Sequence, residues 1–121
     1  MPIKSYKDLE VFQMSYRLAL DISKTTRSFP SYEQFEIGRQ IRRAARSIPA
    51  NIVEGWAKRS SVAEFKRFLL VAIGSCDECK LWLDMSRDEG YLSKESWEDF
   101  QNRMNRIGAM LKNLWKQWHT I

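Results

Sequence analysis

The sequence predicts an all-α protein, an up-down-up-down antiparallel four-helix bundle made from a single domain, residues 1–121. Apolar residues recur at spacings of three and four along four segments, as they do on one face of a helix, and no stretch alternates like a strand. Short connections separate these segments, and short connections make consecutive helices antiparallel neighbours. A hydrophobic content of 44% in 121 residues is enough for one core.

The first helix is expected from about Lys7 to Thr26. Ser5 is its expected N-cap, because Asp8 follows three residues later in a capping-box pattern. Its two apolar stripes are Leu9, Phe12, Tyr16 and Ala19, and Val11, Met14, Leu18 and Ile22.

The second helix is expected to begin after Ser31, whose capping-box partner is Gln34, and to run to about Ala57. Pro49 lies inside it, where a proline has no N–H for the carbonyl four residues earlier and costs about 3 kcal/mol in a regular helix. We expect a kink at Pro49, with Asn51 or water satisfying the carbonyl of Ala45. The alternative is two shorter helices with a break at Pro49.

The third helix is expected to open at Ser61, with Glu64 three residues on. Its main apolar face is Phe65, Phe68, Leu69, Ala72, Cys76, Cys79 and Leu83, and a second face, roughly opposite, is Ala63, Leu70, Gly74, Leu81 and Met85. A helix that is apolar on two sides is buried on two sides. One side can meet its own bundle and the other needs a partner, so we expect a homo-oligomer.

The fourth helix is expected from about Lys94 to Trp118. Its apolar seam is Trp97, Phe100, Met104, Ile107, Leu111, Leu114 and Trp118. These spacings alternate between three and four without a slip, which is typical of the seam of a left-handed bundle.

A row of four arginines on the second helix is the best indication of function. Arg39, Arg42, Arg43 and Arg46 fall within an arc of about 100°, opposite the apolar stripe of the same helix. Residues 39–67 hold eight basic and two acidic residues, a net charge of +6, whereas the rest of the chain has a net charge of −1. Such a patch attracts polyanions, and the planar guanidinium suits bidentate contacts with phosphate.

The sequence therefore predicts a nucleic-acid-binding surface, with RNA favoured over DNA. Its candidate residues are Arg39, Arg42, Arg43, Arg46, Lys58 and Arg59. No motif for reading base edges is recognisable, so we expect binding to the backbone or to RNA shape. The competing interpretation is a solvated helix face, which is what most charge runs are. Trp56, beside Lys58 and Arg59, has two interpretations as well: stacking on an unpaired base, or packing inside the bundle.

Enzymatic and metal-dependent functions have no support in the sequence. The only histidine is His119, near the end of the chain, and no glycine-rich phosphate loop or Ser/Cys–His constellation is present. Cys76 and Cys79 form a C-x-x-C pattern, but both belong to a core stripe, so we expect structural burial. We expect a non-enzymatic protein with no cofactor and no metal.

The environment of the protein is expected to be the cytoplasm. No run of residues approaches the length of a membrane span, the N-terminus lacks the apolar stretch of a signal peptide, and two cysteines without an export signal fit a reducing compartment. Asn51 and Glu54 flank the proline and are expected to be structural, with Glu54 pairing with a nearby arginine or with Lys58 one turn on.

Nearly the whole chain, from Asp8-Leu9 and including Phe29-Pro30, resembles the four-helix-bundle proteins encoded in 23S rRNA intervening sequences. The segments that carry the resemblance are Gln40-Ile-Arg-Arg-Ala-Ala-Arg-Ser-Ile-Pro-Ala-Asn-Ile-Val-Glu-Gly55, Glu64-Phe-Lys-Arg-Phe-Leu69, Gly74-Ser75 with Glu78, and Gly90-Tyr-Leu92. The chain departs from the pattern at Cys79 and Lys80. The resemblance implies a pentameric barrel of bundles with a basic surface. It also implies kinship with the accessory variability determinant of diversity-generating retroelements, which partners a reverse transcriptase and binds nucleic acid.

Two functions follow from these observations. The first is an oligomeric helical bundle that binds RNA or an RNA–DNA intermediate, as an accessory protein to a reverse transcriptase. The alternative is a protein-interaction scaffold whose ring docks a protein partner, with the arginines meeting acidic side chains.

Overall fold

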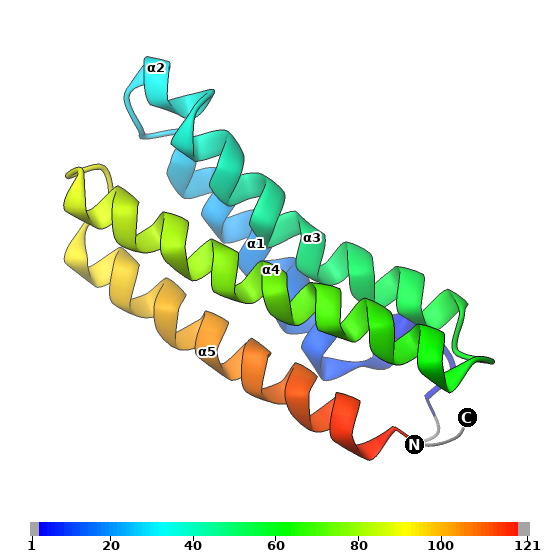
Figure 1. The fold of residues 1–121 in the computed structure, drawn as a ribbon. Coiled ribbons are helices and arrows are strands. Elements are labelled where there is room, and N and C mark those ends of the chain that lie inside the picture. The colour runs from blue at the N-terminus through cyan, green and yellow to red at the C-terminus, as the bar shows by residue number, and fades with distance from the viewer. Residues whose placement is uncertain (1–2, 119–121) are drawn as a thin grey trace.

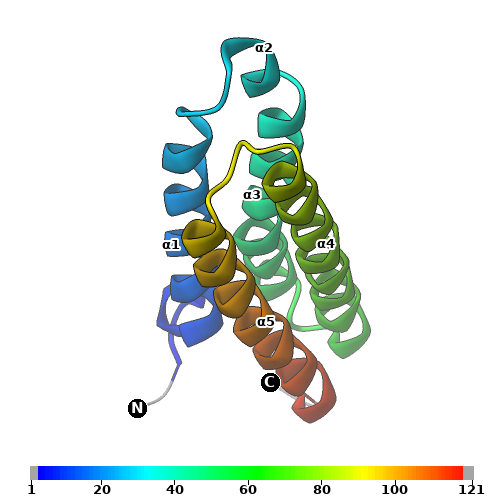
Figure 2. The same cartoon turned by 90° about the vertical axis from the view of Figure 1, so that its left-hand side faces the viewer.

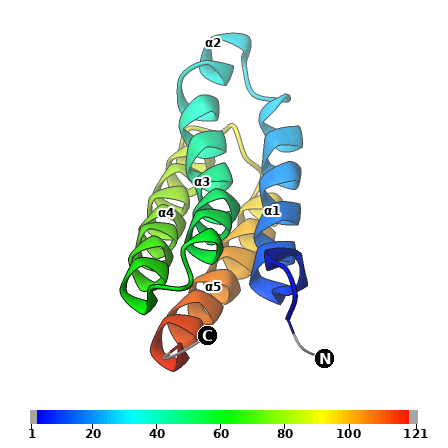
Figure 3. The same cartoon turned by 90° about the vertical axis from the view of Figure 1, so that its right-hand side faces the viewer.

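The computed structural model describes residues 3–118, which form four long antiparallel helices around one hydrophobic core (Figures 1 and 2). The elements are the 3₁₀ turn η1 (Tyr6–Asp8) and the helices α1 (Glu10–Thr26), α2 (Ser31–Gln34), α3 (Ile37–Ala57), α4 (Val62–Asp88) and α5 (Lys94–Gln117). Helix α1 packs against α3 and α5, and α4 packs against the same two helices, as Figure 3 shows from another side. The predicted all-α bundle is confirmed. His119 lies outside the described residues.

The first long helix begins one turn later than predicted. Ser5 and Asp8 do form a capping box, in which the Lys7 amide donates to Ser5 Oγ at 3.2 Å and the Ser5 amide donates to Asp8 Oδ2 at 3.1 Å. That box caps η1, because Leu9 has an extended backbone that separates the turn from α1. The side chain of Leu9 is buried, so the break directs an apolar residue into the core.

The predicted start of the second helix is wrong. Ser31 is the first residue of the single-turn α2, Pro30 holds the N-cap position without a side-chain cap, and α3 begins only at Ile37. Gln34 does not complete a capping box with Ser31. Its amide donates instead to the carbonyls of Arg27 and Phe29, at 3.0 Å each, and so fastens the α1–α2 connection.

Helix α3 bends at Pro49 and continues to Ala57, which excludes the alternative of two shorter helices. The Asn51 amide donates to the Ser47 carbonyl at 2.7 Å and to Ser47 Oγ at 2.9 Å. The expectation that Asn51 serves the Ala45 carbonyl is therefore wrong. Ser47 Oγ also accepts from Ser75 Oγ of α4 at 2.8 Å, and this contact fixes the register of α3 against α4.

The core is formed by the apolar stripes that the sequence predicts, except that Tyr16 of the first helix is 52% exposed. On α4 the main face is buried apart from the half-buried Phe68, with Cys76 and Cys79 at no more than 1% exposed, and burial raises the pKa of both thiols to about 12. Ser61 and Ser93 cap α4 and α5. Among residues 3–118, no cluster of three or more His, Cys, Asp or Glu side chains could hold a metal ion. None of the described helices is long and apolar enough to cross a membrane.

The second apolar face of α4 lies on the surface of the chain. Leu70, Leu81 and Met85 are 53%, 52% and 42% exposed, and Gly74 and Val71 are exposed beside them. Helix α4 thus has one apolar face in the core and a second one that the single chain leaves exposed. The homo-oligomer inferred from it stays a prediction.

Candidate nucleic-acid interface

The four arginines of the predicted row lie on the exposed flank of α3, but they divide between its two neighbours. Arg39 and Arg43 lie on the side of α4, where both line a hollow between the two helices. Arg42 and Arg46 lie on the side of α1, where each donates a hydrogen bond to that helix. One turn separates the members of each pair, so each pair occupies its own edge of α3.

Arg42 is part of the packing between α1, α2 and α3. Its Nη1 donates to Thr26 Oγ1 at 3.0 Å, and its Nη2 donates to the Gln34 carbonyl at 2.8 Å. Burial lowers the pKa of Arg42, and the positive charges of Arg46 and Arg39 lower it further. The guanidinium stays charged at neutral pH. Its hydrogen bonds hold the otherwise buried Thr26 hydroxyl and tie α2 to the start of α3.

Arg46 lies at the edge of an apolar groove between α1 and α3. The groove has a volume of about 350 Å³, and its apolar lining includes Phe12, Tyr16, Leu20 and Val53. Arg46 Nη2 lies 3.5 Å from Ser23 Oγ, a long contact that leaves the exposed guanidinium able to reach a ligand.

Arg39 and Arg43 are exposed, and neither has an acidic partner within 4.0 Å among the described residues. They line a hollow of about 490 Å³ together with Phe35, Gln40, Trp82 and Met85. Three carboxylates, those of Glu33, Glu36 and Glu89, stand around the same hollow. This pair is therefore the part of the arginine row whose charge is least used by the fold.

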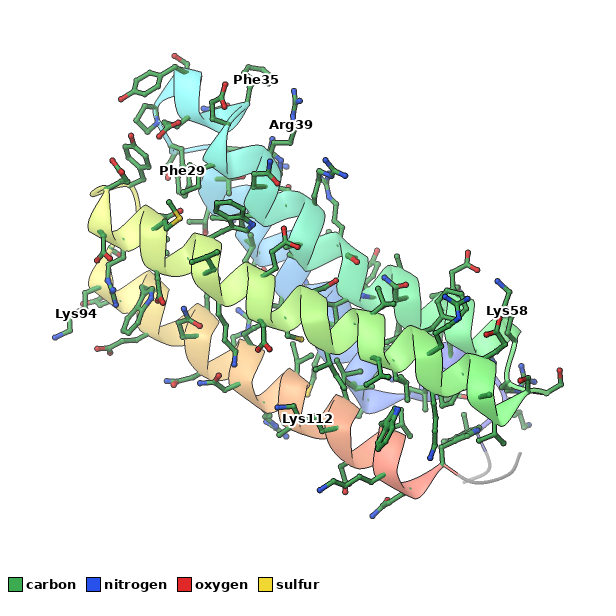
Figure 4. All side chains as sticks on the ribbon, in the orientation of Figure 1. Phe29, Phe35, Arg39, Lys58, Lys94 and Lys112 are labelled. Atoms are coloured by element: carbon green, nitrogen blue, oxygen red, sulfur yellow. The ribbon has the colours of Figure 1, made fainter. Side chains whose placement is uncertain are left out.

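Lys58 and Arg59 lie at the opposite end of α3, as the labelled Arg39 and Lys58 show in Figure 4. The rise of 1.5 Å per helical residue puts Lys58 about 18 Å beyond Arg46 along the axis. Lys58 Nζ pairs with Glu54 at 3.5 Å, as predicted for residues one turn apart, and lies 4.7 Å from the centre of the Phe68 ring. The six candidate residues therefore do not form one continuous surface.

Arg59 covers Trp56 and so decides between the two interpretations of that tryptophan. The guanidinium carbon lies 4.3 Å from the centre of the Trp56 ring, and Nη1 donates to the Trp56 carbonyl at 3.0 Å. Trp56 is only 8% exposed and meets Trp118 edge-on, with 6.2 Å between ring centres. Trp56 packs inside the bundle and offers no free face to a base.

Lys66 and Arg67 complete a second basic group beside the α3–α4 turn. Lys66 lies 4.8 Å from the Trp115 ring centre, and Arg67 lies 4.4 Å from that of Phe68. Arg67 also pairs with Glu64 at 2.9 Å, and this hydrogen bond lowers the pKa of Glu64 and raises that of Arg67. We call Lys58, Arg59, Lys66 and Arg67 the turn cluster. All four cations of the turn cluster rest on aromatic rings.

The sequence did not indicate which side chains surround Arg39 and Arg43. Phe35 is 67% exposed, although phenylalanine usually lies inside, and it stands four residues before Arg39 at the break between α2 and α3. Glu36 and Glu89 stand at the ends of helices that meet only in the folded chain. One signal in the sequence was the four-residue spacing from Phe35 to Arg39 and from Arg39 to Arg43. The predicted helix ran without a break from Ser31, so it did not show that Phe35 lies where α2 ends.

The fold and this surface define a class: an antiparallel four-helix bundle with an exposed apolar face on α4 and two exposed arginines, Arg39 and Arg43, that have no acidic partner among residues 3–118. Residues 7–113 match the family described as "23S rRNA-intervening sequence protein". The chain belongs to this family.

One solved structure supports the assignment. It is described as a protein with unknown function from the S23 ribosomal protein family of Bacteroides thetaiotaomicron VPI-5482. It is similar to this chain with a TM-score of 0.81 and 27% sequence identity, over 88% of this chain and 96% of that one. Among curated proteins, none matches.

Proposed function

We propose that this protein is a non-enzymatic RNA-binding bundle whose principal phosphate contacts are Arg39 and Arg43. The observation that carries the proposal is that both guanidinium groups are exposed and have no acidic partner within 4.0 Å among the described residues. A guanidinium presents donors in a fixed fork that fits two phosphate oxygens. Arg46, which is exposed on the other edge of α3, extends the same surface toward α1.

The remaining candidates have weaker roles in this proposal. Arg42 holds the surface in place through its contacts with Thr26 and Gln34, and adds positive charge without contacting the RNA itself. Lys58 and Arg59 lie at the far end of α3, where an acidic side chain and aromatic rings already hold them. The description of the family, which names an rRNA intervening sequence, favours RNA over DNA as the ligand.

The proposal is tested by a salt titration of binding to a structured RNA. The native protein is compared with the Arg39→Glu/Arg43→Glu variant and with Lys94→Glu/Lys112→Glu, which makes the same change in net charge on exposed lysines of α5 (Figure 4). We expect log K of the native protein to fall linearly with log salt, with a slope of about −0.7 to −0.9 per phosphate contact. The arginine variant should lose affinity and flatten the slope by about 1 per contact removed, whereas the lysine variant should keep most of both.

Binding that is independent of salt, or equal loss in the two variants, would contradict the proposal. An equal loss of affinity in the two variants would mean that RNA binding depends on the net charge of the protein and not on Arg39 and Arg43. Helicity and oligomer size of the three proteins are compared first, so that a folding defect is not read as a binding defect.

A second candidate function is the protein-interaction scaffold, which the exposed apolar face of α4 favours. Leu70, Val71 and Leu81 form a stripe that a single chain leaves in water, and a second copy of the chain is the occupant we propose for it. Met85 lies beyond this stripe, in the hollow that Arg39 and Arg43 line. The groove between α1 and α3 is the complementary apolar surface. A stripe that docks into a different surface of the next copy is a heterologous contact, which closes into a ring when the rotation allows.

The resemblance puts the expected ring at five subunits, and repetition of Arg39 and Arg43 around it would raise the avidity for RNA. Light scattering on the native protein and on Leu81→Glu tests this, with a pentamer expected for the first and smaller species for the second. A reverse transcriptase as partner stays a prediction of the resemblance. Clean protein that binds no RNA and captures one specific polypeptide would favour the scaffold.

A further inference from the structure

The hollow that Arg39 and Arg43 line has a defined order of side chains along its length. The Ser47–Ser75 hydrogen bond sets the antiparallel register of α3 and α4, so that Gln40 lies level with Trp82. Arg43 therefore stands at the inner end of the hollow. Phe35, Glu36 and Glu89 stand at its outer end, where α2 passes into α3.

This order gives the hollow a positive end and a negative end. Arg39 and Arg43 are not ion-paired with any of the three glutamates, although all five side chains line the same hollow. Glu33 lies near Tyr91, and its carboxylate is the main cause that raises the pKa of that phenol. Glu36 and Glu89 have no hydrogen-bond or ion-pair partner for their carboxylates among residues 3–118. A complementary ligand is anionic at one end and rich in hydrogen-bond donors at the other.

An exposed aromatic ring stands at the negative end of the hollow, beside the carboxylates that can accept hydrogen bonds. Phe35 is 67% exposed and projects from the same end of the bundle as Arg39 (Figure 4). Trp82 and Met85 supply an apolar wall further in, and the Trp82 indole N–H is already held by Glu78 Oε2 at 3.0 Å. A flat ring that stacks on Phe35 would bring its edge toward Glu36 and Glu89.

We propose that this hollow takes up an unpaired guanine nucleotide of single-stranded RNA, an inference that rests on the proposed RNA-binding function. The guanine base stacks on Phe35, and such stacking contributes to the affinity for any base. Its N1–H and N2–H₂ groups donate to the carboxylates of Glu36 and Glu89, since an ionised carboxylate only accepts hydrogen bonds. The adjoining phosphates lie on Arg39 and Arg43. Unpaired bases are read in this way, on their Watson–Crick edges, whereas paired bases hide them.

The volume and the charges agree with this ligand. A hollow of about 490 Å³ falls within the range of about 300–1,000 Å³ that is typical of small-ligand pockets. From Glu36 to Arg43 is about 10 Å along the axis of α3, which is comparable with the length of one nucleotide from base edge to phosphate. Adenine, which offers an acceptor at N1 where guanine has a donor, would place a lone pair against a carboxylate.

The test measures binding of the full chain to short uridine-rich RNA oligonucleotides with one central guanine, inosine or adenine. We expect the native protein to prefer guanine over adenine by about tenfold, with inosine, which lacks the N2 amine, in between. Phe35→Ala should weaken binding of all three, and Glu36→Gln/Glu89→Gln should abolish the preference. Tyr32→Ala, which removes another exposed aromatic residue of α2, and Glu95→Gln/Glu98→Gln, which neutralises two exposed glutamates of α5, are the matched controls.

The outcomes separate this inference from the proposed function. Removing two carboxylates raises the net charge, so a purely electrostatic effect would make every oligonucleotide bind more tightly and leave the order of bases unchanged. Equal binding of guanine and adenine by the native protein, or a preference that survives Glu36→Gln/Glu89→Gln, would overturn the inference while RNA binding stands. A native protein that binds none of the oligonucleotides and no structured RNA would overturn both.

Discussion

Four basic residues lie in the first half of α3 and four lie around the α3–α4 turn, and the fold uses the two groups differently. At the end near α2, Arg39 and Arg43 are exposed and without an acidic partner in the described part of the chain, and only Arg42 is committed to packing. At the other end, every member of the turn cluster rests on an aromatic ring, and two of its members also pair with glutamates. Charge is available for a ligand at the first end and is largely used by the fold at the second.

A local excess of charge in a sequence is therefore not by itself a binding surface. Arg59 closes over Trp56, and Lys66 lies over Trp115, so these long side chains shield aromatic rings while their charged groups stay in water. A ligand at the turn cluster would have to compete with these contacts. A ligand at Arg39 and Arg43 has no such competitor.

The largest expected effect compares charge reversal at the two ends. Arg39→Glu/Arg43→Glu should lower the affinity for RNA by about tenfold or more at moderate salt, because each loses a charge-assisted hydrogen bond to phosphate. Lys58→Glu/Arg59→Glu, with the same change in net charge, should lower it by less than about threefold. Fluorescence anisotropy with one labelled RNA measures both, and a larger loss in the second variant would reverse the comparison.

The next effect separates the two kinds of arginine within the row. Arg42→Ala should destabilise the fold by about 1–3 kcal/mol, since it leaves the buried Thr26 hydroxyl and the Gln34 carbonyl without their donor. Arg43→Ala should change the free energy of unfolding by less than about 0.5 kcal/mol. Urea denaturation followed by circular dichroism gives both values. Equal stability of the two variants would show that Arg42 is as free as Arg43.

A smaller effect tests whether the turn end is a packed region. A Cβ at Gly55 would lie 3.0 Å from Phe68 Cβ and 3.3 Å from the Phe65 carbonyl oxygen, both too rigid to withdraw freely. Gly55→Ala should therefore cost about 1–2 kcal/mol despite the better helix propensity of alanine. Gly108→Ala, whose Cβ would meet nothing within 4 Å, should be neutral or stabilising in the same denaturation experiment. A neutral Gly55→Ala would mean that α3 and α4 separate easily at this end.

The smallest effect concerns the Arg67–Glu64 ion pair of the turn cluster. The hydrogen bond from Arg67 lowers the pKa of Glu64, so any contribution to stability is present above the pKa of an unfolded glutamate and is lost as the pH falls through the folded value. Because both side chains are solvated, Glu64→Gln should be indistinguishable from native in denaturation at neutral pH and at acidic pH. A clear loss at neutral pH that disappears in acid would give this ion pair a structural role.

The sequence predicts the long helices well, because their apolar spacing reports directly which face is buried. It predicts the ends of α1 and α3 poorly. Ser5 and Ser31 carry the same capping signal, yet one caps a 3₁₀ turn and the other begins a single-turn helix. The burial of Leu9 and the two hydrogen bonds of Gln34 decide these ends, and both depend on packing between segments.

The candidate interface also depends on contacts between segments that the sequence of one helix does not reveal. Helical geometry places the four arginines on one flank of α3, but it does not reveal that α1 engages Arg42 and that α4 brings Trp82 and Glu89 to the hollow that Arg43 lines. Nor does it reveal that Arg59 folds back over Trp56. Which charges remain free is a property of the assembled bundle.

The most direct test of the central claim is to map where RNA touches the protein. The native chain is cross-linked to a structured RNA by ultraviolet light, and the peptides that carry nucleotide adducts are identified by mass spectrometry. We expect adducts within residues 31–46 and at Trp82, and their loss in Arg39→Glu/Arg43→Glu. Adducts concentrated in residues 56–68, or spread along α5 with none near Phe35, would contradict it.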